Sequence, residues 1–255
     1  MRILIVGATG HIGTYLVPRL VAAGHEVVGV SRGLRQPYHE SPAWQSTRLV
    51  VMDRVEAERN GSFGKAMASL EPDVVVDLTC FDLGSATHIV DALRNRVKLF
   101  IHCGTLWVHG VPQSRPYDET APRKPFGEYG IRKAQIERFL LDEARAGFPA
   151  SVLHPGHITG RGWPPINPAG NLDVTVFERL ARGDKVALPE DGMATLQHVH
   201  ADDVAQAFEP RCSALAAVRD AVDSMTEGAD DTRTGDLSSR TDHHLPRGHS
   251  LGSGP

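Results

Sequence analysis

Three side chains in the middle of the sequence have the chemistry of an acid–base site. Tyr129 and Lys133 are four residues apart in a segment of helical pattern, so both project from one face of the expected helix. A tyrosine hydroxyl has an ordinary pKa of about 10, and a neighbouring ammonium group lowers it by favouring the phenolate. Thr105 ends an apolar segment and offers a hydroxyl to a substrate oxygen. The residues predict proton transfer by Tyr129, although an exposed tyrosine and a solvated lysine have the same spacing.

A glycine-rich segment near the N-terminus has the pattern of a phosphate-binding turn. Residues 7–13 read Gly-Ala-Thr-Gly-His-Ile-Gly, directly after a predicted strand and at the start of a predicted helix. One glycine permits the tight turn, one lets the backbone approach a pyrophosphate, and one allows close packing of helix on strand. The helix N-terminus adds free N–H groups and a partial positive charge. A dinucleotide is therefore predicted to bind here, at Gly7, Thr9, Gly10, His11, Ile12 and Gly13.

The end of the second predicted strand selects between NAD and NADP. A carboxylate at this position binds the ribose 2′-hydroxyl of NAD, whereas an arginine accommodates the 2′-phosphate of NADP. The chain has Ser31 and Arg32 there and no carboxylate, which favours NADP unless Arg32 is simply a solvated loop residue. Asp53, after the third strand, is placed to meet the adenine through its side chain or its neighbour's backbone. Lys133 is a second candidate for the cofactor, at the ribose.

Strand and helix patterns alternate, which predicts an α/β fold: a Rossmann-like, doubly wound parallel sheet. The predicted strands are Ile3–Val6, Glu26–Val30, Arg48–Met52, Asp73–Leu78, Leu99–Cys103 and Ser151–Leu153. The predicted helices between them are His11–Ala23, Ser62–Leu70, Gly84–Arg94 and Gly127–Ala146. Several strands are almost wholly apolar, as expected for strands that are covered on both faces.

The pattern changes after residue 156, so we divide the chain into a NAD(P)-binding domain (1–156), a partial substrate-binding region (157–208) and a disordered tail (209–255). In the second region we expect a loop over His157–Leu172, a helix over Asp173–Arg182, a strand over Lys185–Leu188 and a helix over Asp202–Phe208. His154 and His157 are open to two interpretations, as structural side chains or as substrate contacts. The tail has low hydrophobicity and no periodicity.

Composition excludes several classes of protein. The net charge of −4 does not indicate a nucleic-acid partner, and no apolar run is long enough for a membrane span. Three scattered cysteines indicate buried free thiols and a cytoplasmic protein. The thirteen histidines lack the spacing of metal ligands, so no metal is expected. A small molecule is the expected partner.

Together, the residue 7–13 turn, Asp53, Thr105, the Tyr129–Lys133 pair and the segment 198–205 resemble an extended short-chain dehydrogenase/reductase of the NAD-dependent epimerase/dehydratase group. The resemblance covers residues 1–208. It implies Tyr129 as general acid/base, Lys133 as its partner, Thr105 as the hydroxyl residue, and a homodimer through helices Gly84–Arg94 and Gly127–Ala146.

The chain departs from that family at several positions. Cys103-Gly104 stands where the family has two serines, His109 replaces a tyrosine, and the asparagine expected near Leu83–Thr87 is missing. The family normally continues with further strands and helices where this chain runs into Glu209–Pro255. We interpret that tail as a truncated or frame-shifted end, which leaves a small and incomplete C-terminal substrate lobe.

The sequence thus predicts an NAD(P)-dependent oxidoreductase or epimerase that acts on a hydroxyl or carbonyl carbon, with a sugar nucleotide as the substrate that the resemblance suggests. Two alternatives are a non-catalytic NADP-binding protein that senses redox state and an RNA-binding relative on the same fold; the net charge opposes the second.

Overall fold

The main sheet has six parallel strands in the order β3-β2-β1-β4-β5-β6. The computed structural model describes residues 1–111, 118–193 and 196–213. The strands are β1 Arg2–Val6, β2 Glu26–Ser31, β3 Arg48–Val51, β4 Val74–Asp77, β5 Leu99–Cys103 and β6 Ala150–Leu153. This order reverses between β1 and β4, which is the topological switch point of a Rossmann fold. The predicted fold class is confirmed.

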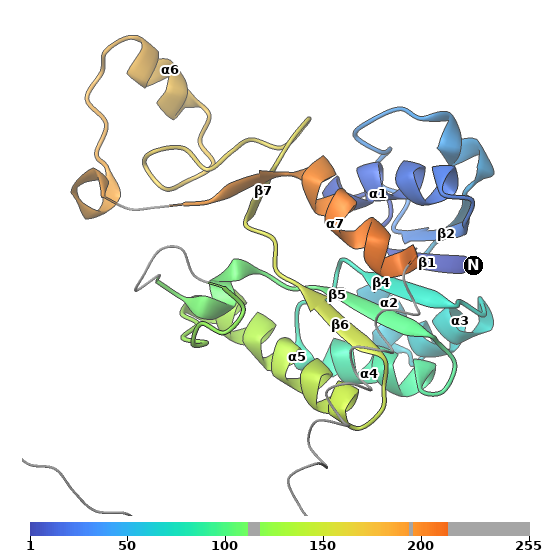
Figure 1. The fold of residues 1–255 in the computed structure, drawn as a ribbon. Helices are drawn as coiled ribbons and strands as arrows, with labels where there is room; N and C mark the ends of the chain where they lie inside the picture. Colours follow the sequence, from blue (N-terminus) through green and yellow to red (C-terminus); the bar gives the residue numbers. More distant parts are fainter. Residues whose placement is uncertain (112–117, 194–195, 214–255) are drawn as a thin grey trace, which may run out of the picture. The chain divides into compact units, whose positions relative to one another are not determined.

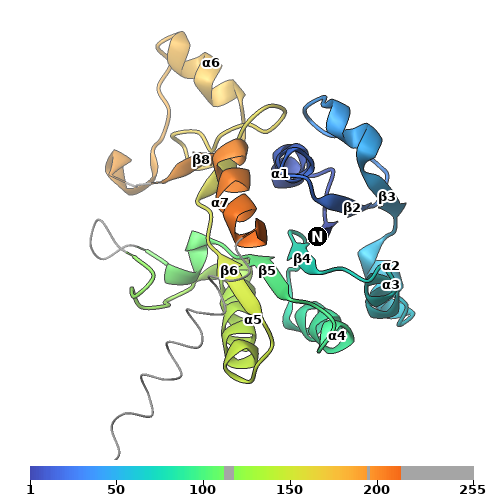
Figure 2. The same ribbon diagram turned by 45° about the vertical axis from the view of Figure 1, so that its right-hand side comes forward.

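Helices cover both faces of this sheet (Figure 1). The α-helices are α1 His11–Ala22, α2 Arg54–Arg59, α3 Phe63–Ser69, α4 Leu83–Leu93, α5 Gly127–Arg145, α6 Thr175–Ala181 and α7 Ala201–Ser213. Three 3₁₀ helices, η1 Pro42–Ser46, η2 Leu106–His109 and η3 Pro189–Gly192, complete the described helical segments. α1 packs against α7 on one face, and α3, α4 and α5 follow one another on the other, as Figure 2 also shows.

The core lies between the sheet and the α3–α5 layer. Val75 and Phe100 from the sheet meet Ile89 of α4 and Ile136 of α5, each with no more than 1% of its surface exposed. Full burial of one such side chain contributes about 1.5–3 kcal/mol. The hydrophobic effect therefore fixes the positions of β4 and β5, whose carboxyl ends carry the candidate site.

The segment predicted as a loop over His157–Leu172 begins with a strand. β7 His157–Thr159 pairs in parallel with β8 His198–His200, so that His157 lies opposite His198. The prediction was wrong at these residues because a three-residue strand has too little pattern to be recognised without its distant partner.

The strand predicted over Lys185–Leu188 is also wrong. The segment is largely exposed, is not paired with any described strand, and leads directly into η3. A segment of four residues does not form a strand unless another strand supplies the hydrogen-bonding partners. Helix α2 was missed for a different reason, since only Ala57 of its six residues is buried and no apolar stripe marks it.

Helix α7 continues past the predicted end at Phe208 to Ser213, so residues 209–213 are helical and not part of a disordered tail. The rest of the predicted tail, residues 214–255, lies outside the described residues. None of the described helices combines the length and the apolar character that crossing a bilayer requires.

Candidate active site

A cavity of about 740 Å³ opens at the carboxyl ends of the sheet strands, where ligands bind in this type of fold. The glycine turn lines one part of it, and Thr105, Tyr129 and Lys133 line another. Of the predicted site residues, all but Gly13 line the cavity: Gly7, Thr9, Gly10, His11, Ile12, Ser31, Arg32, Asp53, Thr105, Tyr129 and Lys133. The structure therefore brings two clusters that are far apart in the sequence to the same cavity.

The glycine turn fits a dinucleotide. A Cβ atom at Gly7, whose φ is +93°, would lie 2.6 Å from Thr79 Cγ2, and one at Gly13 would lie 2.2 Å from the carbonyl oxygen of Ala8. Gly13 thus brings α1 close to the turn and does not face the cavity. Gly10, the N-cap residue of α1, makes no side-chain cap, and Gly10, His11 and Ile12 line the cavity, so the first turn of α1 borders it with N–H groups that no cap side chain occupies. These groups suit a pyrophosphate.

The end of β2 presents a hydroxyl and guanidinium groups to the cavity. Ser31 and Arg32 line it, together with Arg35, which the sequence did not single out and which donates a hydrogen bond to the Tyr38 hydroxyl (3.0 Å). Asp53 also lines the cavity, but its carboxylate accepts a hydrogen bond from the backbone N–H of Glu56 (3.1 Å) as the N-cap of α2. The side chain of Asp53 therefore has a structural role.

Thr105 and Tyr129 lie together at the end of β5. The Thr105 Oγ1 atom accepts a hydrogen bond from Trp107 N (3.3 Å), and the Thr105 side chain is close enough to the Tyr129 phenol to affect its pKa. Burial raises the pKa of Tyr129, and the Thr105 hydrogen bond acts against this. The pKa is thus shifted in the opposite direction to the one that the sequence predicted.

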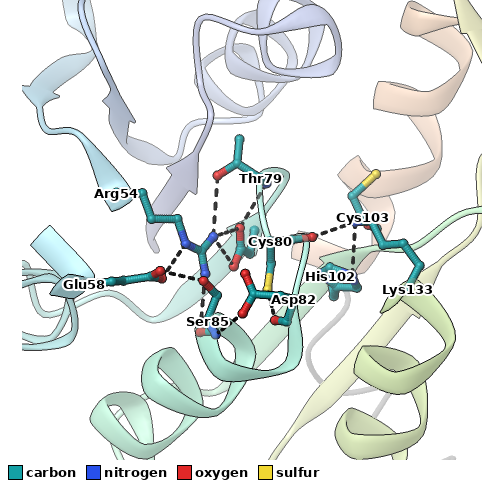
Figure 3. Close-up of polar contacts among 10 residues, drawn as sticks. Arg54, Glu58, Thr79, Cys80, Asp82, Ser85, His102, Cys103 and Lys133 are labelled. Atoms are coloured by element: carbon teal, nitrogen blue, oxygen red, sulfur yellow. Dashed lines mark hydrogen bonds and ion pairs between the residues drawn. The ribbon is translucent and has the colours of Figure 1, made fainter. Parts of the chain in front are cut away.

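Lys133 has other partners than the predicted one. Its Nζ donates to the carbonyl oxygens of Cys80 and Cys103, both at 2.8 Å, and lies 3.5 Å from His102 Nε2 (Figure 3). The side chain is buried, and burial lowers its pKa. Within the described part of the chain, none of the hydrogen bonds of this ammonium goes to Tyr129, so the predicted lowering of the tyrosine pKa by Lys133 is not observed.

A buried ion-pair network lies beside these groups (Figure 3). The Arg54 guanidinium donates to both carboxylate oxygens of Asp77, at 2.8 and 2.9 Å, and to Glu58 Oε1 at 2.7 Å. Glu58 also accepts a 2.5 Å hydrogen bond from the Ser85 hydroxyl. The Asp77 side chain is fully buried and that of Arg54 is 12% exposed. Sequence analysis missed this network because its members come from three separate segments.

Aromatic rings cover the start of α1. Trp163 stacks on His11 with 4.5 Å between ring centroids, and Tyr38 meets the same imidazole edge-on at 5.2 Å. All three line the cavity. The segment after β7 therefore reaches the glycine turn, a contact that residue spacing could not reveal.

The cysteines are free and buried, as predicted. Burial raises the pKa of Cys103, which lines the cavity, to about 11, so the thiol is protonated at neutral pH and is a poor nucleophile. Among the described residues, no three or more His, Cys, Asp or Glu side chains are grouped so as to hold a metal ion.

Glu137 of α5 is a buried carboxylate with two side chains, Arg123 and His154, within hydrogen-bonding distance. Burial raises its pKa, but hydrogen bonds from His154 and Arg123 outweigh that effect and hold the pKa at about 2, compared with 4.5 for an ordinary glutamate. Because the folded-state pKa is depressed, the carboxylate stabilises the fold above pH 4.5, and this contribution is lost as the pH falls toward 2.

We therefore expect Glu137→Gln to flatten the pH dependence of the free energy of unfolding between pH 4.5 and about 2. Urea titrations at several pH values in this window measure it. Glu128→Gln, on an exposed i,i+4 pair of the same helix, is the control and should follow the wild type. Parallel curves for wild type and Glu137→Gln would contradict the expectation.

Comparison with known proteins gives a consistent result. The model of the NAD dependent epimerase/dehydratase family matches residues 3–209. The 2′-dehydrokanamycin reductase of Streptomyces kanamyceticus is 28% identical over 208 residues, which are 82% of this chain and 57% of the reductase. The UDP-glucose 4-epimerase of Mycolicibacterium smegmatis is 29% identical over 231 residues, covering 82% of this chain and 72% of the epimerase. The chain thus spans little more than half of the length of the first of these relatives.

A solved structure supports the fold. The UDP-glucose 4-epimerase of Thermus thermophilus, in complex with NAD, superposes with a TM-score of 0.63 at 23% identity, over 82% of this chain and 73% of that structure. At this identity the similarity establishes a shared fold.

Proposed function

This chain belongs to the NAD dependent epimerase/dehydratase family, and on that premise we propose that it is an NAD(P)-dependent oxidoreductase or epimerase that acts on a hydroxyl or carbonyl carbon. The observation that carries the proposal is the single cavity that the glycine turn shares with Thr105, Tyr129 and Lys133. The nicotinamide, when bound, supplies or accepts the hydride.

Tyr129 is the residue that moves the proton. Its phenolate takes the proton of a substrate alcohol as the carbon loses hydride, and the phenol so formed returns the proton to the oxygen in the reverse direction. Thr105 is 4% exposed and accepts a hydrogen bond from the backbone of η2, which holds its side chain in a defined position, and we propose that its hydroxyl donates a hydrogen bond to the oxygen of Tyr129. This hydrogen bond favours the phenolate, the form that accepts a proton.

We propose that Lys133, which lines the cavity, binds the cofactor ribose. Its ammonium has three hydrogens, and the neighbours of Nζ are two carbonyl oxygens and His102 Nε2. We propose that Lys133 exchanges the weakest of these contacts, the 3.5 Å one to His102, for a ribose hydroxyl.

We further propose that the cofactor is NADP. Support comes from Ser31 and Arg32 at the end of β2 and from the cavity-lining guanidinium of Arg35. A phosphate binds arginine through charge-assisted hydrogen bonds, which are stronger than those to a neutral ribose hydroxyl.

Side-by-side fluorescence titrations with NADPH and NADH test this proposal. We expect the wild type to bind NADPH more tightly than NADH. Arg32→Glu should lose about 10- to 100-fold in NADPH affinity, the usual effect of losing one hydrogen bond to a charged group, and should keep its NADH affinity. Glu40→Gln, on an exposed residue that does not line the cavity, is the control. Tighter binding of NADH by the wild type would reject NADP; binding of neither would reject the dinucleotide.

For the substrate, we propose a sugar nucleotide, because one similar protein is a UDP-glucose 4-epimerase. Incubation with UDP-glucose and either cofactor, followed by chromatography of the products, tests it. The second candidate function is a non-catalytic NADP sensor. The internal hydrogen bonds of Lys133 and the raised pKa of Tyr129 favour it, since both groups lack the predicted contact with each other.

A further inference from the structure

His154 lies directly after β6 and behind Thr105, outside the set of cavity-lining residues. Its side chain is 13% exposed. Its Nδ1 atom is 3.2 Å from the backbone N of Thr105 and 2.8 Å from the carbonyl oxygen of the same residue. Of the two interpretations that the sequence left open, the structure thus gives His154 a contact with the candidate active-site backbone and not with the cavity.

The other nitrogen of the ring is held by a carboxylate. His154 Nε2 lies 3.2 Å from Glu137 Oε1, and Glu137 is 4% exposed. Arg123 donates to the same carboxylate at 2.7 Å and also to the carbonyl oxygen of Ala121. A chain of contacts therefore connects the segment before α5, through the buried Glu137 and through His154, to Thr105.

The proton positions follow from these partners. A carboxylate only accepts, so Nε2 carries a hydrogen that it donates to Glu137. Nδ1 faces both backbone groups of Thr105, at 2.8 Å from the carbonyl oxygen and 3.2 Å from the nitrogen, so it donates to the first when it carries a hydrogen and accepts from the second when it does not. Glu137 therefore orients the ring so that Nδ1 holds the backbone of Thr105.

Gly104 makes room for this arrangement. A Cβ atom at that position would lie 3.0 Å from both Cε1 and Nδ1 of His154 and 2.8 Å from Val152 Cγ1. Any larger residue there pushes against the imidazole. The glycine that replaces a serine of the family pattern and the histidine after β6 therefore depend on each other.

From this geometry we propose that His154 is a positioning residue: oriented by Glu137, it fixes the backbone of Thr105 and so places the Thr105 hydroxyl against Tyr129. The proposal rests on the proposed function for its catalytic consequence, but the positioning itself is a property of the chain alone. His154 does not touch the substrate.

Two substitutions test the contacts of the two ring nitrogens of His154 separately. Asparagine places a polar atom near the position of Nδ1 and can keep the Thr105 contact, whereas glutamine places one near Nε2 and can keep only the Glu137 contact. We expect His154→Gln to release Thr105 and His154→Asn to retain it. Glu137→Gln, which removes the carboxylate that orients the ring, is a third variant and should resemble His154→Gln.

The main measurement is the ultraviolet absorbance titration of the Tyr129 phenol, obtained as the difference between each protein and the same protein with Tyr129→Phe. Because the Thr105 hydrogen bond lowers the pKa of Tyr129, its loss should move the titration to higher pH in His154→Gln and Glu137→Gln and leave it in place in His154→Asn. If UDP-glucose is turned over, kcat should fall about tenfold in His154→Gln, as for one net hydrogen bond, with the KM for cofactor unchanged.

Identical phenol titrations in the wild type and in His154→Gln would overturn the proposal, and so would equal shifts in the Gln and Asn variants, which indicate a merely structural side chain. NADPH and NADH titrations on the same proteins keep the two hypotheses apart. A wild type that binds neither cofactor rejects the proposed function, while the phenol titration still decides whether His154 positions Thr105.

Discussion

Replacing Tyr129 with phenylalanine is expected to lower kcat by about 10²- to 10⁴-fold, the usual contribution of a general acid/base, and to leave the affinity for NADPH unchanged. The substitution removes one oxygen from a residue that is 48% exposed, so it deletes the proposed proton donor and acceptor without opening a cavity in the core. Initial rates with UDP-glucose or a related sugar nucleotide as the substrate measure kcat. Fluorescence titration with NADPH measures the affinity for the cofactor.

Tyr15→Phe is the matched control, because Tyr15 contacts His200 and His39 and does not line the cavity. It should retain wild-type kcat. Full activity in Tyr129→Phe would exclude the phenol from proton transfer. If the wild type binds NADPH but turns over no sugar nucleotide, the sensor function becomes the better explanation.

The second large effect concerns stability. Asp77→Ala should lower the free energy of unfolding by about 3–5 kcal/mol, the usual loss when one partner of a buried ion pair is removed. The substitution leaves the Arg54 guanidinium, which is 12% exposed, without its bidentate partner, and it also removes the acceptor of the Thr79 backbone N–H. Chemical denaturation followed by circular dichroism measures the change.

Glu26→Ala provides the contrast. Glu26 pairs with Arg2 at 2.9 Å, but the two side chains are 59% and 36% exposed, so the expected loss is only about 0–1 kcal/mol. Similar losses for the two variants would show that burial does not make the Arg54–Asp77 pair important. The triple variant Arg54→Met/Glu58→Gln/Asp77→Leu should lose less than Asp77→Ala, because it removes all three charges of the network.

The sheet and its helices could be predicted because each strand carries its own signal. β1, β4 and β5 are mostly apolar and are buried along almost their whole length, and the glycine turn marks the junction of β1 and α1. Such patterns are local, and each predicted strand of the main sheet lies within two residues of the observed bounds. The short β7–β8 pair was not predictable, since its register joins His157 to His198 and neither segment is distinctive alone.

The candidate site also consists of residues that local sequence patterns predict and of contacts that they do not. Tyr129, Lys133, Thr105 and the glycine turn have recognisable spacing, and the structure brings them to one cavity. The Arg54–Asp77 and His154–Glu137 contacts join elements that only the folded sheet places side by side. One local signal for α2 is present in the sequence, because Asp53 followed by Glu56 is a helix-start pattern. The position of Asp53 directly after the third strand favoured a cofactor contact instead, so the helix was not predicted.

The packing of α7 on α1 has a kinetic consequence. Arg19 of α1 donates to the carboxylate of Asp202, 183 positions further along the chain, and also to Glu209. α1 therefore remains without this cover during synthesis until α7 has been made. Contacts of such sequence separation slow folding, because the loop-closure entropy is lost before the contacts stabilise the chain. The helix that carries the glycine turn should accordingly gain its full protection from hydrogen exchange late in folding, after the central strands.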